Sequence, residues 1–157
     1  MTVEFSQETL KKFDEIVRRY PKQEAAMLPV LYLAQEEFGY LSQEAIEYVA
    51  KMMGSPVAQV YGVVTFYTML NMKPIGRHHI QVCRTLPCAL KGAEGITAFL
   101  ESKLGIAPGE TTPDGRFTLS EAECLASCGT APMMQVNDAY YEDLNEKKID
   151  EILGRLK

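Results

Sequence analysis

Apolar residues recur at the spacing of amphipathic helices through the first part of the chain. Residues 6–20 show this period most clearly, and Ser6 can cap the helix that they predict. Comparable patterns cover about residues 26–38 and 42–54. Pro56 is expected at the first position of a fourth helix, where its missing N–H costs little. Four short helices in succession predict a small helical bundle.

The segment 60–70, VYGVVTFYTML, is harder to assign. Three consecutive β-branched residues, Val63–Thr65, weaken a helical prediction because their side chains are stiff. We interpret the aromatic side chains of Tyr61, Phe66 and Tyr67 as core residues. The alternative is a surface that faces a partner, since buried interfaces favour Tyr, Phe and Met.

The pattern changes after the turn-forming sequence at residues 73–76, which we take as a domain boundary. It separates a helical region, residues 1–73, from a second domain, residues 74–157. Residues 78–82 alternate between apolar and polar, with Ile80 and Val82 on one face, and predict a strand. Residues 89–104 then carry apolar residues at helical spacing and predict one continuous helix.

The remainder of the chain predicts a short sheet and a last helix. A Pro-Asp-Gly turn precedes a strand at residues 117–120, and MMQV forms a second strand with a hairpin partner at 139–141. Asn145 can cap the final helix. The order strand, helix, strand, strand, helix predicts an α+β domain whose sheet is covered by helices.

Composition narrows the function classes. The chain has 157 residues, of which 46% are apolar and 24% charged, and this balance is typical of a globular protein. A net charge of -5 argues against a nucleic-acid partner. We see no signal peptide and no apolar run long enough to cross a bilayer, so we expect a cytoplasmic protein without direct membrane insertion.

Four cysteines carry the candidate chemistry, in two pairs with 35 residues between the pairs. Cys83 and Cys88 are separated by four residues, and Cys124 and Cys128 by three. In a reducing compartment such thiols are more often metal ligands than structural disulfides. The spacing favours a [2Fe–2S] cluster, and it leaves zinc binding and thiol–disulfide chemistry open as alternatives.

Other chemistry has little support in the sequence. His78 and His79 invite comparison with Rieske ligation, but adjacent residues on a strand point to opposite faces. The chain has no Gly-rich dinucleotide fingerprint and no nucleophile–base pair. We therefore expect no catalytic residue, and no NADH or flavin on this chain.

The residues around the cysteines resemble a known family. HIQVCRTLPCALKGAE and ECLASCGTAPMMQVNDAYYEDL, with Ala131–Pro132 after the fourth cysteine, closely resemble the thioredoxin-like [2Fe–2S] subunit of respiratory complex I. In bacteria this is the E subunit family of the NADH:quinone oxidoreductase. The resemblance extends upstream through LPVLYLAQEEFGYLS and covers about residues 25–157.

The resemblance implies a fold, a cofactor and partners. The fold would be a helical docking region followed by a thioredoxin-like [2Fe–2S] ferredoxin domain. Cys83, Cys88, Cys124 and Cys128 would together bind one [2Fe–2S] cluster that exchanges electrons with FMN. A neighbouring subunit would bind both the FMN and NADH.

The same resemblance implies other peripheral-arm subunits as neighbours and a location at the inner face of the bacterial membrane. Equivalent subunits of an NAD-linked hydrogenase or a formate dehydrogenase are alternatives, and so is a zinc-stabilised interaction module.

Overall fold

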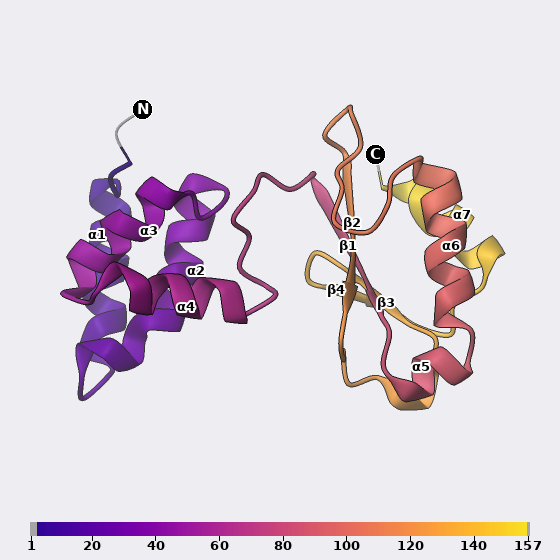
Figure 1. Ribbon diagram of the computed structural model, residues 1–157, viewed down its shortest axis with the longest axis horizontal. Coiled ribbons are helices and arrows are strands. Elements are labelled where there is room, and N and C mark those ends of the chain that lie inside the picture. The colour runs from indigo at the N-terminus through magenta and orange to yellow at the C-terminus, as the bar shows by residue number, and fades with distance from the viewer. Residues whose placement is uncertain (1–2, 157) are drawn as a thin grey trace. The chain divides into compact units, whose positions relative to one another are not determined.

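The computed structural model describes residues 3–156, which form two compact units that divide between Pro74 and Ile75 (Figure 1). The first unit is helical, and the second contains a four-stranded sheet. Each unit has its own cluster of buried apolar side chains. Within residues 3–156, no helix combines the length and the apolar character that a membrane span requires. The chain therefore has the predicted α+β architecture.

The helical unit contains the four predicted helices and one short 3₁₀ turn that the pattern did not predict. Its elements are α1 (Gln7–Arg18), η1 (Gln23–Ala26), α2 (Met27–Phe38), α3 (Gln43–Met53) and α4 (Val57–Phe66). The position of Pro56 differs from the prediction, because this residue precedes α4 with an extended backbone (φ −60°, ψ 138°). Its carbonyl oxygen accepts a hydrogen bond from Val60 N at 3.3 Å, so Pro56 acts as the N-terminal cap residue.

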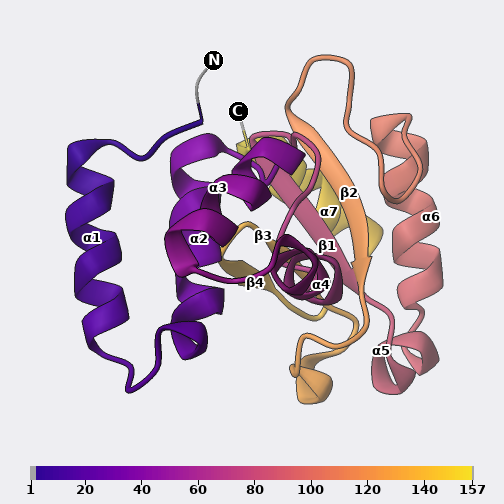
Figure 2. The same ribbon diagram turned by 60° about the vertical axis from the view of Figure 1, so that its left-hand side comes forward.

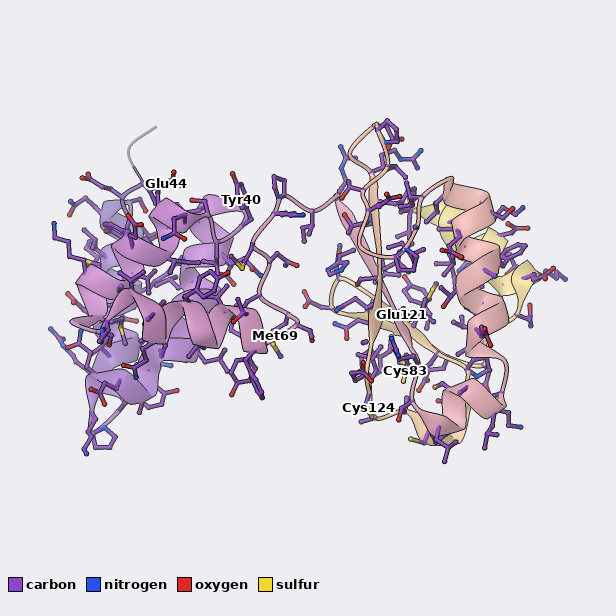
Figure 3. All side chains as sticks on the ribbon, in the orientation of Figure 1. Tyr40, Glu44, Met69, Cys83, Glu121 and Cys124 are labelled. Carbon is purple, nitrogen blue, oxygen red and sulfur yellow. The ribbon has the colours of Figure 1, made fainter. Side chains whose placement is uncertain are left out.

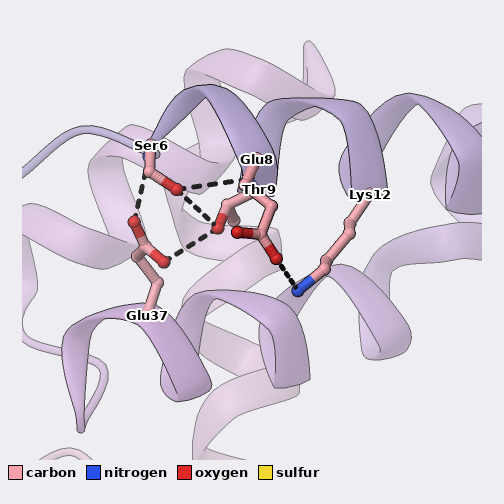
Figure 4. Close-up of polar contacts among 5 residues, drawn as sticks. All are labelled: Ser6, Glu8, Thr9, Lys12 and Glu37. Atoms are coloured by element: carbon pink, nitrogen blue, oxygen red, sulfur yellow. Dashed lines mark hydrogen bonds and ion pairs between the residues drawn. The ribbon is translucent and has the colours of Figure 1, made fainter.

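Polar contacts at the start of α1 connect it to the end of α2 (Figure 4). Ser6 Oγ accepts a hydrogen bond from Thr9 N at 3.2 Å, which confirms the predicted cap. Glu37 accepts hydrogen bonds from Ser6 N at 2.9 Å and from Thr9 Oγ1 at 2.8 Å. These bonds, the one from Ser6 first, hold the pKa of the Glu37 carboxyl below its usual value. One turn further along, Lys12 and Glu8 form an exposed ion pair at 2.8 Å.

The part of the segment that contains the three β-branched residues is helical. The hydroxyl of Thr65 donates to the carbonyl oxygens of Tyr61 and Gly62, at 3.0 and 3.2 Å, so α4 itself satisfies it. Val60 and Val64 are buried in the helical core. Tertiary packing of these side chains therefore outweighs the weak helix propensity of the segment.

Two of the aromatic residues on α4 are surface residues, so their interpretation as core was wrong. The exposed fraction is 43% for Tyr61 and 76% for Phe66, whereas Tyr67 packs against the helical core. Val57 and Met69, the latter labelled in Figure 3, are also exposed. A helix that is apolar on all sides has more apolar surface than one small bundle buries. The excess lies on the surface of α4 and of the segment that follows it.

The second unit is built on a mixed sheet whose strands lie in the order β2-β1-β3-β4. The strands are β1 (His78–Cys83), β2 (Phe117–Ala122), β3 (Met134–Val136) and β4 (Ala139–Tyr141). β1 pairs with β2 in parallel and with β3 antiparallel, and β3 forms a hairpin with β4. Figures 1 and 2 show α6 (Ala93–Leu104) and α7 (Glu146–Arg155) on the same face of this sheet. Ile80 and Val82 of β1, predicted to share one face, are both buried.

The helix predicted over residues 89–104 is broken in two. A short helix, α5 (Leu86–Leu90), ends before Gly92, and α6 begins directly after it. Gly92 has a left-handed backbone (φ +90°), which a continuous right-handed helix does not admit. Leu90, one of the apolar residues within that predicted helix, has an exposed fraction of 78% for this reason.

The remaining predicted elements are present. β2 extends two residues further than predicted, to Ala122, because it pairs with β1 along its whole length. A second 3₁₀ turn, η2 (Cys128–Thr130), precedes β3. Asn145 Oδ1 accepts a hydrogen bond from Lys148 N at 2.9 Å and so caps α7, as predicted.

Candidate metal centre

Parallel pairing of β1 and β2 brings the two cysteine pairs to one end of the sheet. Cys83 is the last residue of β1 and lies opposite Ala122, the last residue of β2. Cys124 follows two residues later, and Figure 3 shows Cys83 and Cys124 at the same end of the unit. Cys88 lies in α5 and Cys128 begins η2. The two segments that carry the cysteines therefore start side by side.

The first cysteine pair is part of the core, and the second is on the surface. Cys83 and Cys88 are each 1% exposed, whereas Cys124 and Cys128 are exposed. Burial, together with a hydrogen bond to Cys83, raises the pKa of the Cys88 thiol, and a backbone hydrogen bond from Met133 acts in the opposite direction. Negative charge on Cys83 and, to a smaller extent, on Cys128 also raises the pKa of the Cys88 thiol.

The exposed segment between Cys124 and Cys128 has an unusual backbone. Ala126 adopts the left-handed region at φ +59°, which L-residues with a Cβ rarely occupy. In this conformation Ala126 N donates a hydrogen bond to Cys124 Sγ at 3.3 Å. This hydrogen bond ties the Cys124 side chain to the backbone of its own turn.

Arg84 links the two cysteine segments. Its backbone N–H donates to the carbonyl oxygen of Ala122 at 3.0 Å, and so extends the pairing of β1 with β2. Its guanidinium lies 3.2 Å from Glu121 and 3.7 Å from Glu123, the residue before Cys124. These partners are distant from Arg84 in sequence, and only the register of the parallel strands predicts them.

A second polar network surrounds Cys128. Thr130 Oγ1 donates a hydrogen bond to Glu142 Oε1 at 2.7 Å, and Ser127 Oγ donates to the same oxygen. These two bonds, the one from Ser127 first, lower the pKa of the Glu142 carboxyl. Sequence reasoning missed Glu142 because it follows β4, 14 positions after Cys128 in the chain.

The side chains of the two histidines differ in their contacts, and the buried Nε2 of His78 has no hydrogen-bond partner. His79 Nε2 lies 2.7 Å from Ser120 Oγ, and burial lowers the pKa of its imidazole. The ring of His78 lies 5.4 Å from the ring of Phe117. Both residues are at the start of β1, whereas Cys83 is at its end. Both histidines therefore lie at the end of β1 away from Cys83, and their exclusion as ligands stays a prediction.

All four cysteines are free thiols, so each can act as a metal ligand in its thiolate form. In the described part of the chain, no three Cys, His, Asp or Glu side chains are grouped closely enough to bind one ion. A [2Fe–2S] cluster is held by four thiolates around two irons, and the sequence contains four cysteines.

Comparison with known proteins gives close relatives over almost the whole chain. The family model "Thioredoxin-like [2Fe-2S] ferredoxin" matches residues 13–157. The E subunit of the NADH-quinone oxidoreductase of Rickettsia prowazekii (strain Madrid E) is 48% identical over 155 residues, which cover 97% of this chain and 88% of that protein. The E 2 subunit of the NADH-quinone oxidoreductase of Rhizobium meliloti (strain 1021) is 43% identical, with 91% of this chain and 85% of that protein covered.

A solved structure shares the fold at lower identity. The crystal structure of an NAD+-reducing [NiFe]-hydrogenase in the air-oxidized state matches with a TM-score of 0.72 and 20% identity. The match covers 83% of this chain but only 22% of the hydrogenase chain. At that identity the likeness concerns the fold alone.

Proposed function

The chain belongs to the thioredoxin-like [2Fe–2S] ferredoxin family, and we propose that it is the electron-carrying E subunit of an NADH:quinone oxidoreductase. Its cofactor is one [2Fe–2S] cluster. Identities of 48% and 43% to two E subunits favour this complex over an NAD-linked hydrogenase or a formate dehydrogenase. Like other such subunits, it contributes to an oxidoreductase without being an enzyme by itself.

The observation that carries the proposal is the convergence of two cysteine pairs at one end of paired parallel strands. We assign Cys83, Cys88, Cys124 and Cys128 as the four cluster ligands. The assignment is supported by the shared strand end and by the absence of any further cysteine in the sequence. When bound there, the cluster supplies one-electron exchange.

The protein residues around the thiols have separable tasks. Burial of Cys83 and Cys88 keeps water from one side of the site. The N–H of Ala126 stabilises negative charge on Cys124 Sγ. Exposure of Cys124 and Cys128 leaves the other side open, where a redox partner can approach closely. The cysteine site thus has one side shielded from water and one side accessible to a partner.

We further propose that the electron partner is a neighbouring subunit that binds FMN and NADH, with other peripheral-arm subunits nearby. The helical region, residues 1–73, would dock to that subunit. Exposed apolar side chains on and after α4, including Phe66 and Met69, support this role because protein interfaces are enriched in aromatic residues and Met. Such a contact should persist at high salt, since salt screens charged groups and not apolar contacts. Through these neighbours the chain would be cytoplasmic and peripheral to the inner face of the bacterial membrane.

The cofactor assignment is tested on the purified full chain. A [2Fe–2S] protein is brown, contains iron and acid-labile sulfide in equal amounts, and is paramagnetic when reduced. A colourless, diamagnetic protein with bound zinc would instead support the interaction-module alternative, and metal-free thiols would support disulfide chemistry. Either result would overturn the proposed electron-transfer function.

The partner assignment is tested by co-purification with the matching flavin subunit at high salt. Phe66→Ser should weaken this complex, whereas Tyr20→Ser, a change at another exposed aromatic residue of the helical unit, should not. Deletion of residues 1–72 should weaken the complex further and leave the cluster absorption largely intact. Undiminished binding of the flavin subunit by the truncated chain would refute the docking role.

A further inference from the structure

The turn that carries Cys128 is held by a side chain from a distant part of the chain. Ser127 directly precedes this cysteine, and Thr130 is the last residue of η2. The hydroxyls of both residues donate to Oε1 of Glu142, the first residue after β4, with 2.7 Å for the bond from Thr130. The two hydroxyl oxygens are themselves 2.9 Å apart. One carboxylate oxygen thus joins both sides of Cys128.

Two hydrogen bonds hold the backbone at Glu142 and Asp143. Its carbonyl oxygen accepts a hydrogen bond from Lys148 Nζ at 2.6 Å, in the first turn of α7. The next residue, Asp143, donates its backbone N–H to the carbonyl oxygen of Thr130 at 2.8 Å. α7 is anchored in turn by Ile149, which is fully buried in the core. Glu142 is therefore connected, through α7, to the buried core of the unit.

We propose that Glu142 is a positioning residue for the cluster, an inference that rests on the proposed function. Its Oε1 holds the turn around Cys128 in the conformation that presents the thiolate, and its negative charge makes reduction of the centre less favourable.

The first task follows from exposure. Cys128 is exposed, and the segment before it contacts the core through the partly buried side chain of Leu125, so polar contacts add the order that burial gives to Cys83 and Cys88. Hydrogen bonds to a carboxylate are stronger and shorter than those between neutral groups. Outer residues that orient metal ligands commonly change metal affinity by about 10- to 100-fold when they are removed.

The second task follows from charge. Reduction adds one electron to a centre that already carries thiolate charges, so a nearby fixed negative charge lowers the reduction potential. Hydroxyl donors from Ser127 and Thr130 keep the Glu142 carboxyl ionised, because they lower its pKa. A neutral side chain of the same shape would hold the turn without this effect.

Substitutions separate the two tasks. Glu142→Ala removes the acceptor and the charge. Glu142→Gln keeps an Oε1 that accepts both hydroxyls but removes the charge. Asp143→Asn is the matched control, because it removes the same charge one residue away at an exposed side chain. Asn also suits the left-handed backbone of this position (φ +47°).

The measurements use the full chain with its cluster: the rate of iron loss to excess chelator, the EPR spectrum of the reduced form, and the reduction potential. Glu142→Ala should lose iron about 10- to 100-fold faster than the wild type. Glu142→Gln should lose iron at nearly the wild-type rate with an unchanged EPR spectrum, and its potential should shift to more positive values. The shift should exceed that of Asp143→Asn.

The combined change Ser127→Ala and Thr130→Val removes the same contact from the other side and should accelerate iron loss in the same way. This variant tests the positioning role of Glu142 if Glu142→Ala does not fold. Wild-type rates of iron loss in these variants would overturn the positioning role. A Glu142→Gln potential no more positive than that of Asp143→Asn would overturn the role of charge. A wild-type chain without a [2Fe–2S] spectrum would instead refute the proposed function.

Discussion

Truncation of one buried leucine in each unit should destabilise that unit alone. Leu31 of α2 and Leu100 of α6 are both fully buried, one in the helical core and one in the core under the sheet. Replacement by Ala removes three carbons, which at about 0.8 kcal/mol for each buried CH₂ costs about 2.4 kcal/mol. The cavity left behind raises the expected loss of unfolding free energy to about 3 kcal/mol for either variant.

The assay follows two signals of the full chain in urea. Far-UV circular dichroism reports helix content, most of it from the helical unit, and visible absorption reports the cluster. Leu31→Ala should lower the midpoint of the dichroism change by roughly 1–3 M urea and leave the absorption midpoint in place. Leu100→Ala should lower the absorption midpoint by a similar amount, because α6 packs directly on β1.

The two midpoints move independently only if the two units unfold separately. Each has its own buried cluster, and the chain divides between Pro74 and Ile75. If Leu31→Ala lowered both midpoints together, the two cores would form one cooperative unit. The docking role proposed for the helices would then be inseparable from cluster binding.

Three further predictions concern single residues. Cys124→Ser should lose most of its iron, since the sequence has no spare cysteine, and full iron content with an unchanged reduced spectrum would contradict this. Gly76→Ala should destabilise the sheet by about 1–3 kcal/mol in urea unfolding, because the new Cβ would lie 2.8 Å from the backbone carbon of Phe117. Gly95→Ala, in open space on α6, should instead stabilise by about 0.5–1 kcal/mol, and equal responses would refute the argument. Folding lowers the pKa of Glu37, so its hydrogen bonds stabilise the fold at pH values above 4.5, the usual carboxyl pKa. This stabilisation is lost as the pH falls through the lower pKa of the folded state, where the carboxyl becomes protonated. The melting temperature of Glu37→Gln should therefore differ from wild type at neutral pH and converge with it in acid, and a constant difference would contradict this.

The sequence predicted most clearly what short-range chemistry determines. Ser6 and Asn145 were expected to cap helices, and each side chain accepts the capping hydrogen bond. Alternation along β1 identified Ile80 and Val82 as buried. In each case the signal lies within a few residues of the structure that it predicts.

The sequence was a poor guide wherever tertiary context decides. Helical periodicity ran through Gly92, and only its left-handed backbone separates α5 from α6. The apolar residues of α4 looked like core, yet Phe66 is mostly exposed because the bundle has no further face to cover it. Tertiary packing and partner surfaces produce the same composition, so periodicity alone does not distinguish them.

The same division applies to the candidate site. Cysteine spacing identified the candidate ligands, but the contacts of Arg84 and Glu142 depend on strand register and on the hairpin that follows β3. No local pattern marks Glu142, since a glutamate after a strand is usually a solvated surface residue. The ligand assignment itself remains a prediction until iron content is measured.

The two cysteine pairs are held by different physical means. Cys83 and Cys88 belong to the apolar core, where close packing fixes their side chains and hydrogen bonds between the two thiols and from Met133 add to it. Cys124 and Cys128 are exposed, and the bonds of Ala126 and Glu142 hold their segment. Substitutions in the core should therefore free both cysteine pairs from the cluster together, because the strands that carry them would loosen. Substitutions in the polar network should free only the exposed pair from the cluster, on the side that a redox partner can approach.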